Sequence, residues 1–265
     1  KSGAYGLAQA LLVVLGVWYF AFWISRKVFN VDDEMSTMIA SSVSICGVSA
    51  AIATCGTIRG NQKKLSYVIS LVMVVAIPML YIMPLLCDWI LPMIFPNNEL
   101  AAQQVAGAWL GGTIDTTAAV AASGALLGEV AGDTAVIVKA SQNVLLGLAA
   151  FAISLFWSVR DTGSVMETKG SVIWHRFPKF VLGMVIASAV FSLWFNGGVE
   201  IDGNMVKYKA IAKNFQGMFF SIAFVCIGLE TRFKEIFNKE NRASLKAFLT
   251  AQTFNIIFTF IVAVV

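Results

Sequence analysis

The sequence predicts an all-α polytopic membrane protein, and three observations support this fold class. Of the 265 residues, 58% are hydrophobic and only 13% are charged, and the mean hydropathy is +0.78, which is outside the usual range of soluble domains. Apolar windows of about 20 residues, the length that a helix needs to cross the hydrocarbon core of a bilayer, recur along the chain. Shorter segments of alternating hydrophobicity, which are typical of membrane barrels, do not.

Apolar segments separated by short polar loops follow one another along the chain. Most have the length of a single membrane-spanning helix, but the fourth contains glycines, threonines and a carboxylate at its centre. We interpret 1–265 as one transmembrane domain, and an apolar segment so close to a first residue that is not Met suggests further helices upstream. The segments lie near 5–25, 36–58, 66–87, 101–128, 134–157, 178–196, 210–229 and 244–265.

Loop charges predict the orientation, because Lys and Arg near helix ends are retained on the cytoplasmic side. The loops 59–65, 159–179 and 230–246 carry an excess of Lys and Arg, and we place them in the cytoplasm. The loop 87–100 and the turn 128–133 each contain two acidic residues and no basic one, and we place both outside. We therefore expect a multi-pass protein of the cell's inner (plasma) membrane.

This orientation restricts how the fourth segment, 101–128, can lie in the membrane. If 101–128 crossed the membrane completely, the acidic turn that follows it would lie inside and the basic loop 159–179 outside. The charges agree with the rule only if 101–128 enters and returns on the same side. We therefore predict a re-entrant hairpin or a broken helix, with its break in the sequence GGTIDTT.

The break at 111–117 suggests a binding site, because unwound backbone inside a bilayer is tolerated where it is buried in protein or lines a watery cavity. Glycines are poor helix formers, and Asp and Thr favour helix starts. An ionisable side chain at this depth costs at least about 2.5 kcal/mol unless it has a partner or faces a cavity. Asp115 is therefore a candidate sodium ligand with Thr113, Thr116 and Thr117, a candidate proton carrier, or simply a helix cap.

A second stretch, SICGVSAAIATCG at 44–56, lines up with TIDTTAAVAASG at 113–124 when one gap is allowed. Transporters build sites from paired broken helices near the middle of the membrane, and free N–H groups at a helix start favour anions. Small residues in membrane helices also serve close packing alone, and that alternative stays open. The candidates in this stretch are Ser44, Cys46, Gly47 and Ser49.

Lys139 lies in an apolar helix that begins near an acidic turn. Its side chain could extend to the membrane surface, or it could pair with Asp115 or with an anion in the core. Gln142 and Asn143 continue the same helix, and Asn143 shares a face with Lys139 because the two are four residues apart.

These motifs resemble those of the YeiH-type sulfate exporter family, which is grouped with sodium/proton antiporters and bile-acid symporters. The resemblance rests on SICGVSAA at 44–51, GAWLGGTIDTTAAVAASG at 107–124, AVIVKASQN at 135–143 and GLETRFKE at 228–235. The family pattern has His at the position of Asp115 and Glu-Val where this chain has Thr-Thr. The resemblance therefore places the chain in a divergent branch.

The resemblance implies an inverted-repeat transporter bundle with a mobile core and a more rigid panel that makes oligomer contacts. In that arrangement 36–58 would be one broken crossing helix and 210–229 its repeat-related partner. This differs from the argument from charge, which makes 101–128 the broken element, although both could hold. A homo-oligomer, with a dimer favoured, is also implied.

The sequence therefore favours a secondary active transporter of a small anion, sulfate-like or a small carboxylate, coupled to sodium or protons by an elevator-type motion. A channel-like or sensory membrane protein, in which the small residues only pack, is the alternative. We expect neither an enzyme nor a nucleotide-driven pump, since HExxH, GxSxG and GxxxxGK[ST] motifs are absent.

The partners that we expect are the small anion and the lipid bilayer. Nucleic acid is not expected, since membrane topology accounts for the net charge of +4. No cofactor is expected beyond Na⁺. The candidate anion-binding residues are Ser44, Cys46, Gly47, Ser49, Gly112, Thr113, Thr116, Thr117, Lys139, Gln142 and Asn143, and the candidate ion-coupling residues are Asp115, Thr113, Thr116 and Thr117.

Overall fold

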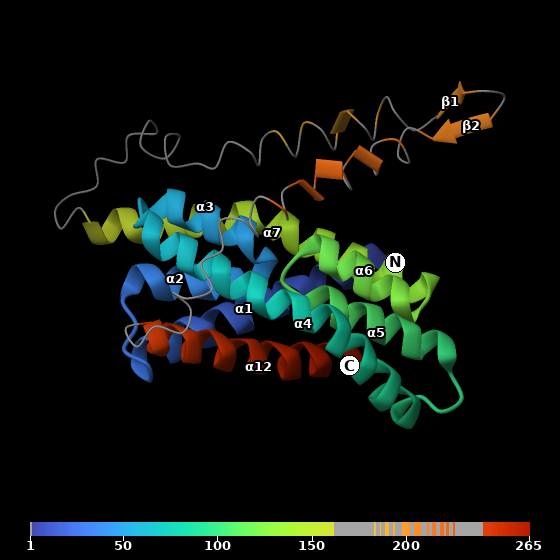
Figure 1. Cartoon of the computed structure of the whole chain (residues 1–265), viewed down its shortest axis with the longest axis horizontal. Coiled ribbons are helices and arrows are strands. Elements are labelled where there is room, and N and C mark those ends of the chain that lie inside the picture. Colours follow the sequence, from blue (N-terminus) through green and yellow to red (C-terminus); the bar gives the residue numbers. More distant parts are fainter. Residues whose placement is uncertain are drawn as a thin grey trace.

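A computed structural model describes residues 2–161 and 241–265, together with scattered positions between 183 and 225. The described part is helical (Figure 1), apart from an antiparallel pair formed by β1 (Gly198–Ile201) and β2 (Asn204–Lys207). The all-α polytopic class predicted from composition is confirmed. The expectations for 159–179, 178–196, 210–229 and 230–246 fall wholly or mostly outside the described residues.

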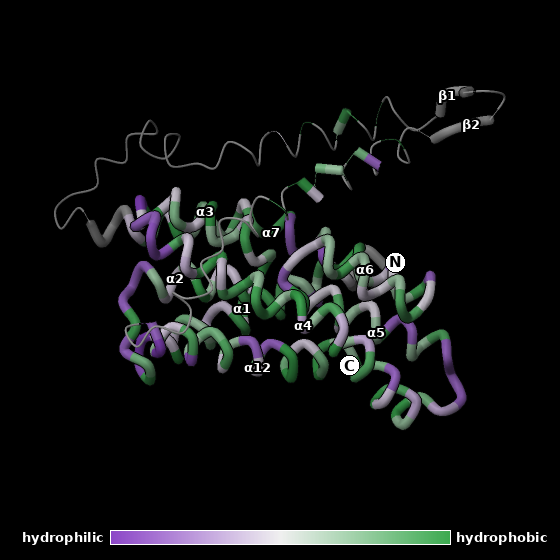
Figure 2. The backbone as a smooth tube through the Cα atoms, viewed as in Figure 1, coloured by the Kyte–Doolittle hydropathy of each residue, from purple (hydrophilic) through white to green (hydrophobic). Residues whose placement is uncertain are grey.

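Four helices in the described part are long and apolar enough to cross a membrane. They are α1 (Ser2–Lys27), α4 (Gln62–Ile94), α7 (Glu129–Asp161) and α12 (Arg242–Val264). Figure 2 shows apolar residues along most of their length and hydrophilic residues gathered at the loops of the bundle. Between these four helices lie two pairs of shorter segments, which do not cross.

The first pair replaces the single span expected at 36–58. The chain forms α2 (Asp33–Ser41), a π-helical turn η1 (Ser42–Cys46) and α3 (Val48–Ile58), and it reverses direction at Gly47. At the start of α4, Lys64 lies 2.7 Å from Asp32, which caps α2. Both ends of this segment therefore lie at one end of the bundle. The prediction that 36–58 crosses the membrane as a single span is wrong. We call α2, η1 and α3 hairpin A.

Local chemistry explains why the helix stops at this point. The hydroxyl groups of Ser42 and Ser44 donate to the carbonyl oxygens of Met38 and Ala40, four residues earlier, a bond that bends helices. Gly47 then adopts φ 59° and ψ −111°, a conformation that glycine adopts without a steric penalty. A side chain at this residue would also meet Val72, 2.8 Å from the position of a Cβ atom.

The second pair consists of α5 (Glu99–Thr113) and α6 (Thr117–Leu127). The helix is interrupted between them, where Ile114 and Thr116 are extended. Gly128, which follows α6, lies beside Gln103 in the first turns of α5. The two helices thus leave and return to the same end of the bundle, as a re-entrant hairpin requires. We call α5 and α6 hairpin B.

Hairpin B packs unusually closely against α7. A Cβ atom on Gly107 would lie 2.4 Å from the carbonyl oxygen of Ala131, and one on Gly111 would lie 2.5 Å from that of Ala135. Only glycine allows the two backbones to approach this closely. The same contacts show that α5 runs parallel to α7.

The two hairpins enter the bundle from opposite ends and meet at their tips. A Cβ atom on Gly47, at the tip of hairpin A, would lie 3.1 Å from the Cβ atom of Asp115, at the tip of hairpin B. The end that holds the base of hairpin A is rich in basic residues, and the other end is acidic. Basic residues at the first end include Arg26, Lys27, Arg59, Lys63 and Lys64, and acidic residues at the second include Asp88, Glu99, Glu129 and Asp133.

Candidate functional site

The candidate site is the place where the two tips meet, and a carboxylate and an ammonium group are buried there. Asp115 and Lys139 are each only 1% exposed. The Lys139 Nζ atom donates to the Ile45 carbonyl oxygen at 2.6 Å and to Gln142 Oε1 at 3.0 Å. The two oxygens of Asp115 have no hydrogen-bond partner among the described residues. The structure thus buries Asp115 and Lys139 in the same region, as one of the alternatives from the sequence expected.

Amide side chains on the long helices satisfy the carbonyl groups that the broken helices leave free. The last carbonyl groups of a helix have no partner within it. Gln142 donates to the Gly112 oxygen at 3.1 Å, and Gln252 donates to the Thr113 oxygen at 3.1 Å. Asn255 donates to the Val43 oxygen of hairpin A at 3.0 Å and to Thr113 at 3.3 Å. It therefore joins the two tips.

The charges at the site match the ends of the broken helices. Lys139 contacts the C-terminal end of η1, where the helix dipole is negative, and this placement favours a cation. Asp115 lies beside Gly47, the residue at the start of α3, and just before α6, where dipoles favour an anion. The two charges attract each other, although Asp115 takes part in none of the ion pairs of the described residues.

Several other expected site residues have structural tasks. The Thr116 hydroxyl group accepts a hydrogen bond from the Ala119 N–H and caps α6. The Thr117 hydroxyl group accepts one from Asn143 Nδ2 at 3.3 Å. Ser44 is bonded within its own helix. These three hydroxyl groups therefore each have a partner within the protein, whereas Thr113 Oγ1 has none among the described residues.

The remaining candidates divide by exposure. Cys46, Gly47, Gly112 and Thr113 are buried at the two tips, whereas Ser49 is exposed on the first turn of α3. Thr117 and Asn143 are half-buried. Ser49 therefore does not line the buried centre.

Sequence reasoning missed the contribution of α12. Gln252, Asn255 and Thr259 are buried and face the tips, and Thr259 Oγ1 donates to Asn255 Oδ1 at 2.8 Å. Figure 2 shows a hydrophilic stretch in the middle of this otherwise apolar helix. Their spacing of three and four residues puts them on one helix face, and this signal was present in the sequence.

The family model described as conserved hypothetical protein 698 matches residues 1–251. The chain belongs to this family. It is 36% identical to a UPF0324 membrane protein of Rhodopirellula baltica and 35% identical to one of Nitratidesulfovibrio vulgaris, each over 98% of this chain. A UPF0324 membrane protein of Nitrosomonas europaea is 29% identical over 87% of the chain.

The chain covers 47%, 45% and 50% of these three relatives, so it spans about half the length of the curated relatives that it matches. No solved structure matches the chain. The relatives' names support a membrane protein, in agreement with the apolar helices. The exporter name implied by the sequence motifs goes beyond these matches.

Proposed function

We propose that this protein is a secondary active transporter of a small anion, sulfate-like or a small carboxylate, coupled to sodium or protons. The observation that carries the proposal is the meeting of two hairpin tips, one from each end of the bundle, around buried Asp115 and Lys139. Secondary transporters place their sites where discontinuous helices meet near the middle of the membrane. Tips that only packed would not need two buried charges, which are costly in a membrane.

The order of the elements supports an alternating-access mechanism. α1 is followed by hairpin A, and α4, which runs in the opposite direction, is followed by hairpin B. We propose that these are inverted repeats, since such repeats relate the two halves of many transporters. An elevator-type motion would carry the tips as one unit, because Asn255 bonds both of them.

An anion would bind through groups that favour negative charge. Lys139 uses two of its three donors on Ile45 and Gln142, which leaves one for a ligand. The first turns of α3 and α6 begin at the tips, and their N–H groups favour anions. Half-buried Asn143 and Thr117 lie at the edge of this region.

The test is transport by the purified full-length protein in lipid vesicles. Sulfate, sulfite, bicarbonate and small carboxylates are first screened for an increase in melting temperature, since a ligand that binds only the folded state stabilises it. Radiolabelled anions that give an increase are then used in counterflow. We expect saturable uptake that an unlabelled anion inside the vesicles accelerates. Uptake without saturation would indicate a channel, and no response to any anion would favour a sensory or other passive protein.

The partners and location follow from the same proposal. We propose a homo-oligomer, with a dimer favoured, in the inner (plasma) membrane. The basic end at hairpin A would face the cytoplasm because Lys and Arg are retained there.

A further inference from the structure

Four buried oxygen atoms at the tip of hairpin B have no hydrogen-bond partner among the described residues. They are the two carboxylate oxygens of Asp115, Thr113 Oγ1 and Gln252 Oε1. The three residues are 1%, 1% and 3% exposed. A buried polar atom without a partner is costly, and native structures contain few of them. Four such oxygens from neighbouring side chains therefore need a common explanation.

One of the two polar atoms of the Gln252 amide group holds it at the tip of hairpin B. The Gln252 Nε2 atom is committed to the Thr113 carbonyl group at 3.1 Å, so the other atom of the amide, Oε1, is the one left free. The Gln252 side chain lies beside the Asp115 carboxyl group, yet the contact falls short of a hydrogen bond among the described residues. Among the described residues, therefore, no group donates a hydrogen bond to either Asp115 carboxylate oxygen or to Gln252 Oε1.

Lys139 does not donate to these oxygens. Its ammonium group donates to Ile45 and Gln142, and it forms no ion pair with Asp115 among the described residues. The C-terminal end of α5, where the helix dipole is negative, also points at this place, because Thr113 is the last residue of that helix. The surroundings therefore favour a cation that is not part of the described chain.

We propose that Asp115, Thr113 and Gln252 form a sodium site between the tip of hairpin B and α12. The proposal rests on the proposed function only for its role in coupling, and it names the coupling ion. Sodium accepts carboxylate, hydroxyl and amide oxygens together, as hard cations do. The ligand set differs from the one expected from sequence, because Gln252 takes the place of Thr116 and Thr117.

Sodium explains the four oxygens better than a proton or a divalent ion. A single proton on Asp115 would satisfy one carboxylate oxygen and one acceptor, whereas sodium contacts several oxygens at once. Magnesium demands near-ideal octahedral geometry and keeps much of its water, which an enclosed site does not supply. Lys139 nearby also disfavours a second positive charge on the ion.

The experiment is a sodium titration of the full-length protein in detergent without added substrate anions. Sodium chloride replaces choline chloride at constant ionic strength, and the melting temperature is recorded. We expect a saturable increase with sodium and none with potassium. Asp115→Asn should abolish it, and Thr113→Val and Gln252→Leu should each raise the apparent dissociation constant about tenfold, since each removes one oxygen ligand.

The matched control is Thr57→Val, which removes another buried threonine hydroxyl group, whose hydrogen bond among the described residues is to the Ala53 carbonyl oxygen in α3. This variant should keep the parent's sodium response. Each variant's melting temperature in choline reports the effect on folding alone, so a less stable variant remains informative. Thr113→Val tests the proposal even if Asp115→Asn fails to fold.

The outcomes separate this inference from the proposed function. Two results would overturn the sodium site and leave anion transport intact. One is a melting temperature that changes with pH but not with sodium. The other is an unchanged sodium-dependent increase in melting temperature in both Thr113→Val and Gln252→Leu. A normal sodium response in a protein that neither binds nor transports anions would keep the site and remove the proposed function. Loss of the response in Thr57→Val as well would show that the effect is not specific to these oxygens, and this too would overturn the site.

Discussion

Hairpin A and hairpin B meet tip to tip, but they turn in different ways. Hairpin A turns at one residue, Gly47, with φ 59°. Hairpin B breaks over three residues that begin with Ile114 at φ −75° and ψ 129° and end with Thr116 at φ −110° and ψ 137°. A turn at glycine presents only backbone groups, whereas an extended break can present a side chain. Tip A therefore supplies carbonyl and amide groups, and tip B supplies the carboxylate Asp115.

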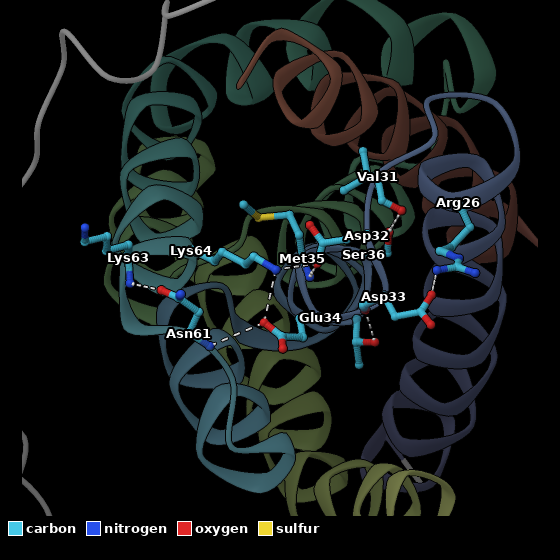
Figure 3. Close-up of polar contacts among 11 residues, drawn as sticks. Arg26, Val31, Asp32, Asp33, Glu34, Met35, Ser36, Asn61, Lys63 and Lys64 are labelled. Carbon is cyan, nitrogen blue, oxygen red and sulfur yellow. Dashed lines mark hydrogen bonds and ion pairs between the residues drawn. The ribbon is translucent and has the colours of Figure 1, made fainter. Parts of the chain in front are cut away.

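The two hairpins are also held in different ways. Ion pairs join the base of hairpin A to its neighbours, Arg26 with Asp33 and Lys64 with Asp32 and Glu34 (Figure 3). Among the described residues no ion pair joins hairpin B to its neighbours, and glycines instead bring it close to α7. Hairpin A thus has ion pairs at the bundle end in addition to buried apolar residues such as Met38 and Ile39, whereas hairpin B makes close backbone contacts inside the bundle. The comparison teaches that two similar hairpins, both packed through apolar residues, can add different contacts to that packing.

The largest effect that we predict is the presence or absence of thiol labelling at single cysteines. It tests whether the two hairpins enter the membrane from opposite sides. The four native cysteines are replaced first, and single cysteines are then introduced as Gln62→Cys, Asn97→Cys and Asp133→Cys, all at exposed positions. An impermeant thiol reagent outside intact cells should label positions 97 and 133. Position 62, at the base of hairpin A, should react only after permeabilisation, because basic loops stay inside.

Two outcomes would contradict this topology. Opposite accessibility of positions 97 and 133 would mean that 101–128 crosses the membrane. Labelling of all three positions from outside would place both hairpin bases on one side. Labelling before and after permeabilisation, on the same cells, controls for intrinsic differences in thiol reactivity.

The next effect tests the close contact that holds hairpin B. Gly111→Ala places a Cβ atom 2.5 Å from the Ala135 carbonyl oxygen, which is backbone and cannot rotate away. We expect a loss of about 1–3 kcal/mol of stability, the usual cost of overpacking, measured as a lower melting temperature. Gly56→Ala in hairpin A is the matched control, because a Cβ atom there meets nothing within 4 Å. Equal shifts for the two variants would show that close approach does not distinguish the hairpins.

A smaller effect concerns the cation that supports tip A. Lys139→Met removes the group that donates to the Ile45 oxygen. It also removes the positive charge that we propose binds the anion. We expect anion affinity to fall about tenfold, or about 1.4 kcal/mol, while the protein stays folded. Ser141→Ala, on the same helix, removes a hydroxyl group that bonds to Ile137 and is the control. Unchanged anion affinity in Lys139→Met would reduce this lysine to a structural role.

The break in hairpin B could be predicted from sequence, but the turn in hairpin A could not. The loops on either side of 101–128 have clear charges that demand a return to the same side. The loop before hairpin A holds Arg26 and Lys27 against Asp32, Asp33 and Glu34, so its charge is nearly balanced and predicts no side. The segment 36–58 also has the length of a full span. One glycine with positive φ reverses it, and sequence does not show φ.

Four parts of the structure form the site, and residues in three of them, hairpin A, hairpin B and α7, could be predicted from the sequence. Asp115, Lys139 and Gln142 were identified because polar side chains in apolar helices need partners. Gln252 and Asn255 share the same property, but α12 lies far along the chain, and only packing shows that its polar face reaches the tips. The spacing of these residues predicts a common helix face, and it does not predict which helix that face meets.

The smallest effect tests the charges at the base of hairpin A. Figure 3 shows the Lys64 side chain between Asp32 and Glu34, to which its Nζ atom donates at 2.7 and 3.1 Å, whereas the Lys63 side chain points away. Lys64 is 32% exposed, and Asp32 and Glu34 are 50% and 35% exposed, so water and salt weaken these pairs. We expect Lys64→Met to cost less than about 1 kcal/mol and Lys63→Met to cost nothing measurable. Because salt screens exposed charges, the difference between the two melting temperatures should shrink as the salt concentration rises. A difference of several degrees that persists at high salt would mean that Lys64 acts through the packing of its side chain and not through its charge, and this contrast between the two hairpins would disappear.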